Sequence, residues 1–202
     1  MAGKRRSVRR VTTVSKDHPS SDVIILTGPP GAGKSTTARA LVSGHPRAVH
    51  LHTDDFWRAI ASGVIPPYLP EADTQNQVVL RVIQGAAATY AAGGFVTVID
   101  GVIGPWMLHH FAAADDTPAA RPHYVVLRPA LDETLRRALG RKAPDALVDE
   151  GPVGSLWEQF SDLGAMESHV IDTTDQQPAE TLASVQDAIA SGAFRLRRDT
   201  GS

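Results

Sequence analysis

Residues 23–36 read VIILTGPPGAGKST, and this stretch decides the fold. The apolar run 23–26 has the composition of a buried strand, and Gly28-x-x-x-x-Gly33-Lys34-Ser35 matches the phosphate-binding loop pattern G-x-x-x-x-G-K-[ST]. Glycines let such a loop curl so that its N–H groups point at phosphate oxygens, and the following helix adds its positive end. The lysine can reach the β- and γ-phosphates, and the serine hydroxyl can ligate Mg²⁺. A nucleoside triphosphate is therefore expected on Gly28, Pro29, Pro30, Gly31, Ala32, Gly33, Lys34, Ser35 and Thr36.

Composition narrows the class of protein. The 202 residues include no cysteine, which excludes disulfides, thiolate metal sites and cysteine nucleophiles. The formal net charge of −2 gives the molecule as a whole no bias toward nucleic acid or acidic membranes. No apolar run approaches the roughly 18 residues of a membrane span, so we expect a cytoplasmic protein with no membrane partner.

The two ends of the chain differ from its middle. Residues 1–21 are rich in Lys and Arg and lack apolar periodicity. We expect a disordered basic tail there, the alternative being an arm that touches nucleic acid. Residues 194–202 are expected to form a second, frayed tail, which leaves residues 22–193 as a single domain.

Five apolar runs alternate with five segments whose spacing suits a helix. Several runs are continuous, as in strands that are buried on both faces of a parallel sheet. The pattern predicts an α/β fold, a three-layer α/β/α sandwich whose ligands lie at the carboxyl ends of the strands. The expected strands are Val23–Thr27, Ala48–His52, Phe95–Ile99, Tyr124–Leu127 and His169–Ile171, and the expected helices are Ser35–Val42, Asp55–Ser62, Thr74–Ala92, Leu131–Leu139 and Pro178–Ala190.

Carboxylates follow two of these strands. Asp54 and Asp55 come directly after the second strand and open a helix, where they can cap it or complement its dipole. Beside a phosphate-binding loop, Asp54 fits better as a general base that takes the proton of an attacking hydroxyl. Asp100 follows the third strand and is expected to bind Mg²⁺ together with Ser35, or to contact the substrate. A simple Asp-Gly turn is the alternative for Asp100.

Two arginines four positions apart, Arg137 and Arg141, would share one face of a helix. Phosphoryl transfer spreads negative charge over three oxygens, so a guanidinium supplied here would stabilise the transferring group. The segment that follows is punctuated by proline and glycine, which suits a mobile lid over about residues 136–154. A solvated basic helix surface is the alternative.

The acceptor pocket is expected at residues 56–92 and 101–111. Aromatic side chains and prolines gather there, which suits a drug-like or sugar-containing molecule, although each aromatic alone is more often part of a core. Nearby carboxylates would make the mouth acidic and favour a cationic acceptor. His50 and His52 share one face of a strand, where packing or hydrogen bonding is expected rather than metal binding. The expected substrate contacts are Asp54, Asp55, Trp57, Arg58, Asp100 and Trp106.

Over about residues 22–190 the chain resembles the small P-loop kinases. These AAA-type small-molecule kinases include the chloramphenicol phosphotransferases, the zeta-toxin-like kinases, and the shikimate and gluconate kinases. The resemblance implies a P-loop NTPase fold with a lid and a five-stranded parallel sheet in the order 2-3-1-4-5. It also implies ATP and Mg²⁺, with Asp54 as the base, Arg137 and Arg141 as lid arginines and Thr174 on the adenine side. The matching pieces are Gly28–Ser35, Thr53-Asp54-Asp55, Asp100, Arg137-x-x-x-Arg141 and Val170-Ile171-Asp172-Thr173-Thr174.

The resemblance implies transfer of the γ-phosphate of ATP to a hydroxyl of a small molecule. We expect the protein to be a monomer or a homodimer. The chain lacks the glycine-rich substrate loop of the shikimate kinases and the basic clamp expected for a phosphate acceptor. We therefore expect a neutral or cationic acceptor, of the antibiotic, sugar or nucleotide-sugar type, rather than a nucleoside monophosphate. Two alternatives stay open: a kinase for nucleic-acid 5′-hydroxyls that uses the basic tail, and a non-catalytic binding module gated by ATP.

Overall fold

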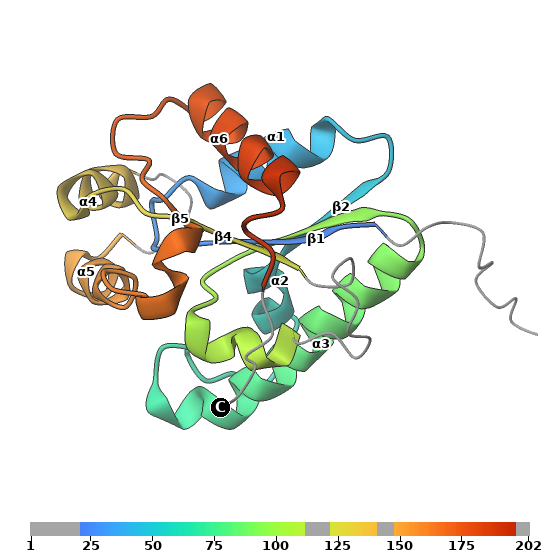
Figure 1. Ribbon diagram of the computed structural model, residues 1–202. Helices are drawn as coiled ribbons and strands as arrows, with labels where there is room; N and C mark the ends of the chain where they lie inside the picture. The colour runs from blue at the N-terminus through green and yellow to red at the C-terminus, as the bar shows by residue number, and fades with distance from the viewer. Residues whose placement is uncertain (1–20, 112–121, 141–147, 197–202) are drawn as a thin grey trace, which may run out of the picture.

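The computed structural model describes residues 21–111, 122–140 and 148–196. Five strands in these ranges form one parallel sheet in the order β2-β3-β1-β4-β5, which confirms the expected fold and strand order (Figure 1). Because β1 lies between β3 and β4, the phosphate-binding loop leaves the middle of the sheet. The strands are β1 Val23–Thr27, β2 Ala48–His52, β3 Val96–Asp100, β4 His123–Leu127 and β5 Val170–Ile171.

Helices cover both faces of the sheet. Figure 1 shows α1 and α6 together on one face, with α2, α3 and the 3₁₀ helix η2 on the other, and α4 beside α5 near β5. Within the described ranges, no helix combines the length and the apolar character that crossing a bilayer requires. The helices are α1 Lys34–Ser43, α2 Thr53–Arg58, α3 Asp73–Ala92, α4 Leu131–Leu139, α5 Glu150–Glu158 and α6 Pro178–Ser191, with 3₁₀ helices η1 Pro70–Ala72, η2 Pro105–Phe111 and η4 Gly164–His169.

The strands are apolar throughout because each face of the sheet carries its own core. Ile24 and Leu26 pack with Val185 of α6 on one face, whereas Ile25 packs with Ile83 of α3 on the other. Each of these side chains is at most 1% exposed, and full burial of such a side chain contributes about 1.5–3 kcal/mol. The two cores hold the carboxyl ends of the strands at one rigid edge.

Helix α2 begins earlier and ends earlier than the expected Asp55–Ser62. It follows β2 without a break, and His52 occupies the N-cap position, so Asp54 does not cap the helix. Beyond α2 the chain is tied down as a loop, because the side-chain amide of Gln75 accepts from the N–H of Ile65 at 2.8 Å and donates to its carbonyl at 2.7 Å. The expected last turn of the helix, residues 59–62, is therefore not part of α2.

The expected lid is only partly described, and its last part is a helix. The side chain of Asp149 caps α5 by accepting from the N–H of Gly151 at 3.1 Å, and Val153 is fully buried. α5 packs against α4, so residues 150–154 belong to a packed element instead of a loop. Residues 141–147, which include Arg141, lie outside the described residues, as do residues 1–20 and 197–202 of the expected tails.

Residues 194–196, placed by the sequence in a frayed tail, pair with the start of β4. The N–H of Tyr124 donates to the carbonyl of Phe194 at 2.8 Å, and an isolated antiparallel bridge joins His123 and Arg195. Arg195 also forms an ion pair with Asp22 at 2.5 Å. These contacts extend the ordered domain to residue 196.

Candidate active site

The phosphate-binding loop has the backbone that only its glycines allow. Gly28, Gly31 and Gly33 have φ of 137°, 89° and 92°, a region that residues with a side chain rarely adopt. A Cβ on Gly28 would stand 2.0 Å from the carbonyl oxygen of Leu127, and one on Gly31 would stand 2.7 Å from that of Thr134. The loop is therefore packed tightly between the end of β4 and α4, at the carboxyl edge of the sheet.

Lys34 begins α1, and its ammonium group lies against the loop. Its Nζ donates to the carbonyl oxygens of Gly28 and Pro29, both at 2.9 Å. The residue is only 9% exposed, so its charge is held mainly by protein groups. The helix that begins here presents its N-terminal amides and positive dipole end to the same space. A buried cation beside such amides is suited to bind phosphate groups.

Asp100, at the end of β3, is a buried carboxylate in an uneven environment. Its Oδ2 lies 3.1 Å from Nε2 of His50, whereas its Oδ1 is buried and makes no hydrogen bond with the described residues. Burial would raise the pKa of Asp100, but the hydrogen bond to His50, the nearby hydroxyl of Ser35 and the charge of Lys34 together hold it below its usual value. An ionised carboxylate with one unpaired buried oxygen, near the loop serine, fits a divalent cation or its bound water.

The segment after β3 is fixed by neighbouring strands. Thr27 Oγ1 donates to the carbonyl of Ile103 at 3.0 Å and accepts from its N–H at 2.8 Å, while the Tyr124 hydroxyl donates to the same carbonyl at 2.9 Å. A Cβ on Gly101 would stand 1.9 Å from Oγ1 of Thr53, so the ends of β2 and β3 touch. These contacts bring the Asp54 backbone and Asp100 to the same edge of the sheet.

The two carboxylates after β2 differ in their partners. Asp54 is exposed and makes no hydrogen bond or ion pair with the described residues, so its carboxylate is available to a ligand. Asp55 forms an ion pair with Arg58 at 3.0 Å, and its Oδ1 lies 3.9 Å from Nδ1 of His52. Asp55 therefore reduces the charge that Arg58 can offer to a substrate.

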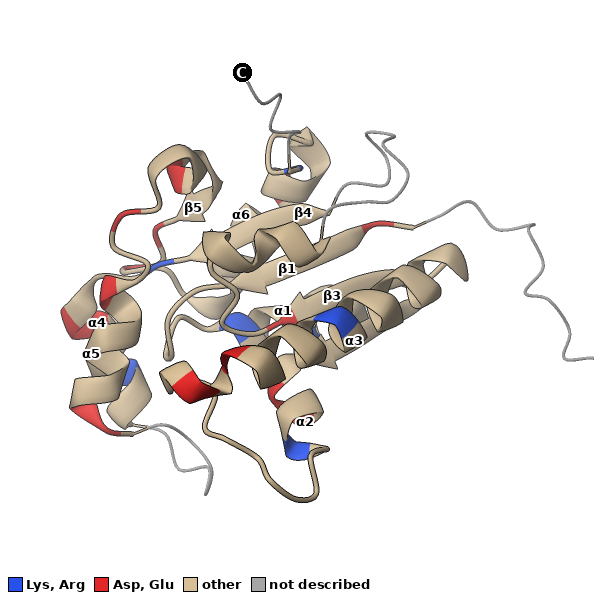
Figure 2. Ribbon diagram, turned by 90° about the horizontal axis from the view of Figure 1, so that it is seen from below, with Lys and Arg blue, Asp and Glu red and all other residues tan. Residues whose placement is uncertain are grey.

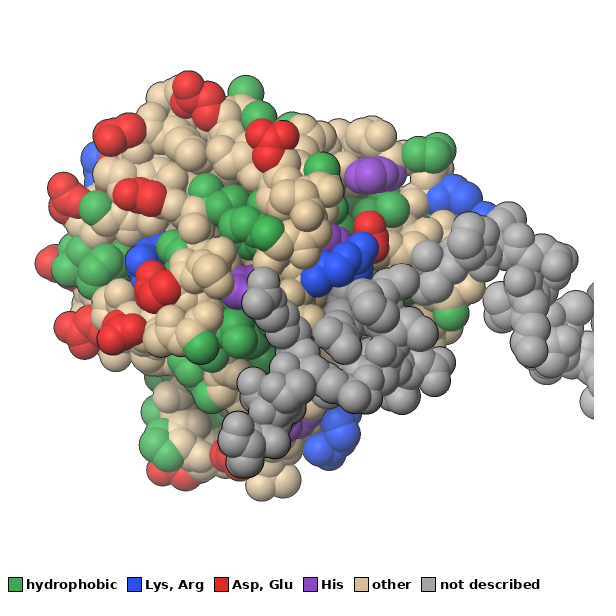
Figure 3. Space-filling view, in the orientation of Figure 1, with side chains coloured by type: hydrophobic (Ala, Val, Ile, Leu, Met, Phe, Trp, Pro, Cys, Tyr) green, Lys and Arg blue, Asp and Glu red, His purple; other side chains and the backbone are tan. Residues whose placement is uncertain are grey.

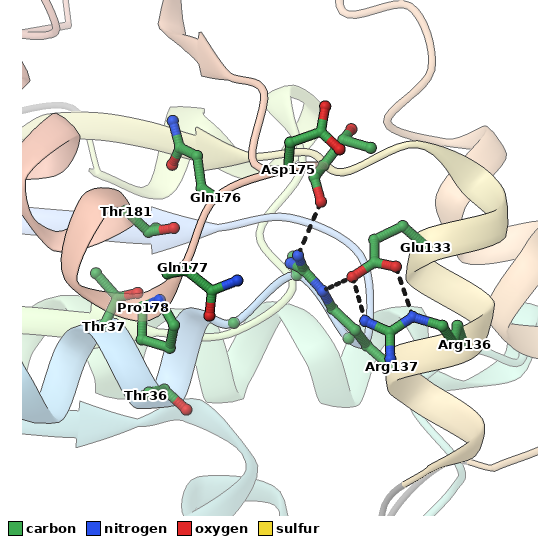
Figure 4. Close-up of a pocket in the computed structure, with 14 residues that line it drawn as sticks. Thr36, Thr37, Glu133, Arg136, Arg137, Asp175, Gln176, Gln177, Pro178 and Thr181 are labelled. Carbon is green, nitrogen blue, oxygen red and sulfur yellow. Dashed lines mark hydrogen bonds and ion pairs between the residues drawn. The ribbon is translucent and has the colours of Figure 1, made fainter.

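A cavity of about 530 Å³ opens beside the phosphate-binding loop (Figure 4). One wall is formed by the loop and the start of α1, a second by α4, and a third by the segment between β5 and α6. Its lining is mostly polar, and includes the predicted Thr36, Arg137 and Thr174. The remaining residues that line it are Gly31, Ala32, Gly33, Thr37, Glu133, Arg136, Asp175, Gln176, Gln177, Pro178 and Thr181.

Arg137 is held rigidly in the wall of this cavity. Its Nε donates to Glu133, and its Nη2 donates to the carbonyls of Thr173 and Thr174 at 3.0 and 3.1 Å. Hydrogen bonds from Arg136 and Arg137 lower the pKa of Glu133 to about 2, so this carboxylate stays ionised and keeps both guanidinium groups in place. Figure 4 shows these bonds at the side of the cavity opposite α1 and α6.

The side chains on the expected acceptor side come from α2, α3 and η2. The indole N–H of Trp57 donates to the side-chain oxygen of Asn76 at 2.8 Å, and the amide of Asn76 donates to the Pro67 carbonyl at 2.8 Å. Trp106 is 49% exposed and lies with its ring 6.3 Å from that of Phe160, just beyond α5. Trp57 is thus engaged in holding the loop after α2, while Trp106 leaves an aromatic surface open to a ligand.

Several residues of the site escaped the sequence analysis. Glu133 precedes Arg137 by four positions, and this i, i+4 pairing was a signal that could have identified it. Asp175, Gln176 and Gln177 enter the cavity wall without any motif that would mark them. Among the described residues, no group of three or more histidine and carboxylate side chains is arranged to hold a metal ion by itself.

Comparison with known proteins finds one family model and two curated relatives that resemble the chain. A family model described as an AAA domain matches residues 23–156, more than half of the chain. A cytidylate kinase from Corynebacterium efficiens is 27% identical over 174 residues, which cover 81% of this chain and 75% of the relative.

Solved structures share the fold. A sugar kinase from a Janibacter species matches with a TM-score of 0.64 at 17% identity, covering 88% of this chain and 99% of that one. A tunicamycin resistance protein from Deinococcus radiodurans matches with a TM-score of 0.59 at 20% identity and the same coverage. The neighbours also include a shikimate kinase from Acinetobacter baumannii, with a TM-score of 0.59 at 19% identity and coverage of 85% and 94%. The chain shares its fold with these structures, and by its family match it belongs to the AAA domain family.

Proposed function

We propose that this protein is an ATP- and Mg²⁺-dependent phosphotransferase that moves the γ-phosphate to a hydroxyl of a small molecule. One observation carries the proposal: the buried Lys34, the half-paired carboxylate of Asp100 and a polar cavity of about 530 Å³ adjoin the same glycine loop. The lysine serves the triphosphate, the carboxylate serves its cation, and the cavity serves the nucleobase and ribose, so ATP needs all three side by side.

The nucleoside of ATP occupies the cavity and its phosphates extend along the loop. The guanidinium of Arg137 is planar and fixed by Glu133, so it offers a flat cationic surface to a base or ribose. Thr36 and Thr174 supply polar contacts from α1 and from the segment after β5. Loop amides and Lys34 then hold the phosphate oxygens.

Ser35 and Asp100 would hold Mg²⁺ beside the phosphates. The ion supplies positive charge that offsets the negative charge of the transferring group. Residues of the chain provide the remaining steps. Asp54 accepts the proton of the acceptor hydroxyl, whose oxygen forms a new bond to the γ-phosphorus while the bond from that phosphorus to the ADP oxygen breaks. Arg137, and Arg141 from the undescribed part of the lid, would steady the charge on the nucleotide.

The acceptor is a hydroxyl compound without a phosphate that needs clamping. Segment 53–111 carries five acidic residues, at positions 54, 55, 71, 73 and 100, against two basic residues, at positions 58 and 81. Figure 2 shows acidic residues on α2 and at the start of α3. Because Arg58 is paired with Asp55, this side favours a neutral or cationic acceptor of the antibiotic or sugar type. Nucleotide sugars, whose diphosphate is anionic, are a further class that the acidic side favours less.

The nucleic-acid alternative has less support. Acidic side chains gather over the end that holds α4 and α5 (Figure 3), whereas a nucleic-acid surface is basic. The cytidylate kinase relatives favour a different second candidate, a nucleoside monophosphate acceptor, because their identity of 24–27% extends over more than four fifths of this chain. CMP therefore belongs among the acceptors that are tested.

The test is phosphate transfer from γ-labelled ATP to aminoglycosides, other hydroxylated antibiotics, sugars, sugar nucleotides, CMP and a 5′-hydroxyl oligonucleotide. On the acceptor that is labelled, Asp54→Asn is expected to lower kcat about 10²- to 10⁴-fold while ATP binding is kept. Asp187→Asn, at an exposed aspartate of α6 away from the site, is the matched control and should retain the wild-type activity. Wild-type turnover by Asp54→Asn would remove Asp54 from the base role.

A further inference from the structure

The two oxygens of the Asp100 carboxylate have different surroundings. Oδ2 lies 3.1 Å from Nε2 of His50 and 3.9 Å from Nε2 of His52, whereas Oδ1 has no hydrogen-bond partner in the described part of the chain. The Asp100 side chain is 1% exposed, so water has little access to it. A buried carboxylate oxygen without a hydrogen bond lowers the stability of the protein, unless a ligand or cation binds to that oxygen.

The histidines reach Asp100 because of strand register. His52 is the direct neighbour of Asp100 across the β2–β3 pair, and His50 lies opposite Val98. Side chains two positions apart share one face of a strand, and the two imidazole rings meet edge-on with centroids 6.2 Å apart. Although His52 is the direct neighbour, His50 makes the shorter contact. Its side chain is also better buried, at 18% exposed against 31% for His52.

The direction of this hydrogen bond follows from the charge of the carboxylate. A carboxylate that holds Mg²⁺, as the proposed function has it for Asp100, is ionised. An ionised carboxylate only accepts hydrogen bonds, so Nε2 of His50 must carry the proton that it donates. Oδ2 is then occupied, and Oδ1 is the oxygen left for a cation or its bound water.

We propose that His50 is a positioning residue, whose Nε2–H holds Oδ2 of Asp100 so that Oδ1 is presented to the divalent cation bound with the nucleotide. The inference rests on the proposed function and adds a residue that no motif marks. Partners that orient a metal-binding carboxylate typically change metal affinity about 10- to 100-fold when they are removed. A purely structural role would lower stability and leave the cation dependence of nucleotide binding unchanged.

The experiment is calorimetric titration of the full chain with ATP at a series of MgCl₂ concentrations from limiting to saturating, and once in EDTA. His50→Leu removes the N–H donor, His50→Gln keeps one, and His52→Leu is the matched control on the same strand face. We expect His50→Leu to need about 10- to 100-fold more Mg²⁺ for the same gain in ATP affinity, with unchanged affinity in EDTA. His50→Gln should recover most of the loss, and His52→Leu should resemble the wild type.

Three results would overturn the inference. An unchanged Mg²⁺ requirement in His50→Leu, with lowered stability toward urea, would show that His50 only satisfies a buried carboxylate. An equal loss in His50→Gln, with both variants folded by circular dichroism, would show that the donor is not what matters. Failure of the wild-type protein to bind ATP would remove the proposed function, and the role of His50 with it, which distinguishes that failure from the other two.

Discussion

His123 makes the stability of this protein depend on pH in a defined window. The residue begins β4 and is fully buried, and neither ring nitrogen makes a hydrogen bond with the described residues. Its Nε2 lies 3.9 Å from Oδ1 of Asp22, a carboxylate oxygen that is already bonded to Arg195. Burial, and then the charge of Arg195, lower the pKa of His123 from 6.5 to about 4, with Asp22 opposing them weakly.

The sign and the size of the effect follow from this pKa. In the unfolded chain His123 binds a proton below pH 6.5, whereas in the folded protein it stays neutral until about pH 4. The contribution of the neutral His123 imidazole to the free energy of unfolding is therefore fully present above pH 6.5, and it is lost as the pH falls toward 4. Protonating His123 costs about 3 kcal/mol more in the folded state than in the unfolded state. The free energy of unfolding should therefore fall by roughly 2 kcal/mol between about pH 7.5 and about pH 5.

Urea unfolding at several pH values measures this directly. His123→Leu keeps similar bulk without a titrating ring, so its free energy of unfolding should fall roughly 2 kcal/mol less than that of the wild type over the same range. His45→Gln, at an exposed histidine, is the control and should follow the wild type. Parallel pH dependence in His123→Leu and the wild type would refute the reasoning. A second variant, His123→Gln, guards against a folding defect that is particular to leucine.

Two further predictions concern nucleotide binding and helix stability. Arg137→Ala removes the guanidinium fixed by Glu133 in the cavity wall and should raise the Kd for ATP roughly 10- to 100-fold, measured by calorimetry. Arg39→Ala, at an exposed arginine of α1 outside the cavity lining, is the control and should change the Kd little. A loss of equal size in Arg39→Ala would contradict this. Gly85→Ala in α3 should raise the free energy of unfolding by about 0.5–1 kcal/mol, because alanine favours a helix interior more than glycine does. The added methyl group meets no atom within 4 Å. Urea unfolding measures the effect, and a lower free energy of unfolding would contradict the prediction.

The fold and the phosphate-binding loop could be predicted because their signals are local. The glycines, Lys34 and Ser35 stand in one short stretch, and the alternation of apolar strands and helices fixes the α/β class. Helix α5 could not be predicted in the same way. Gly151, Pro152 and Gly154 resemble a loop in the sequence, yet burial of Val153 against the rest of the domain outweighs their low helix propensity.

Contacts between segments that are far apart in the sequence could not be predicted either. The hydrogen bond from His50 to Asp100 depends on how β2 and β3 are aligned, and the sequence indicated only that two histidines share one face. Residues 194–196 join the domain through Arg195 and Asp22, which stand at opposite ends of the described chain. Such pairings arise from tertiary geometry, which composition and spacing do not encode.

We expect the phosphate-binding loop to support transfer of the γ-phosphate from ATP to an acceptor. The rate of ADP production from ATP and Mg²⁺ tests this most directly, measured with antibiotics, sugars, sugar nucleotides, CMP and a 5′-hydroxyl oligonucleotide, and with Lys34→Ala as the blank. We predict that one class of hydroxyl compound stimulates ADP production by the wild type and leaves Lys34→Ala unaffected. Equal rates with and without every acceptor, or equal stimulation of Lys34→Ala, would contradict the account.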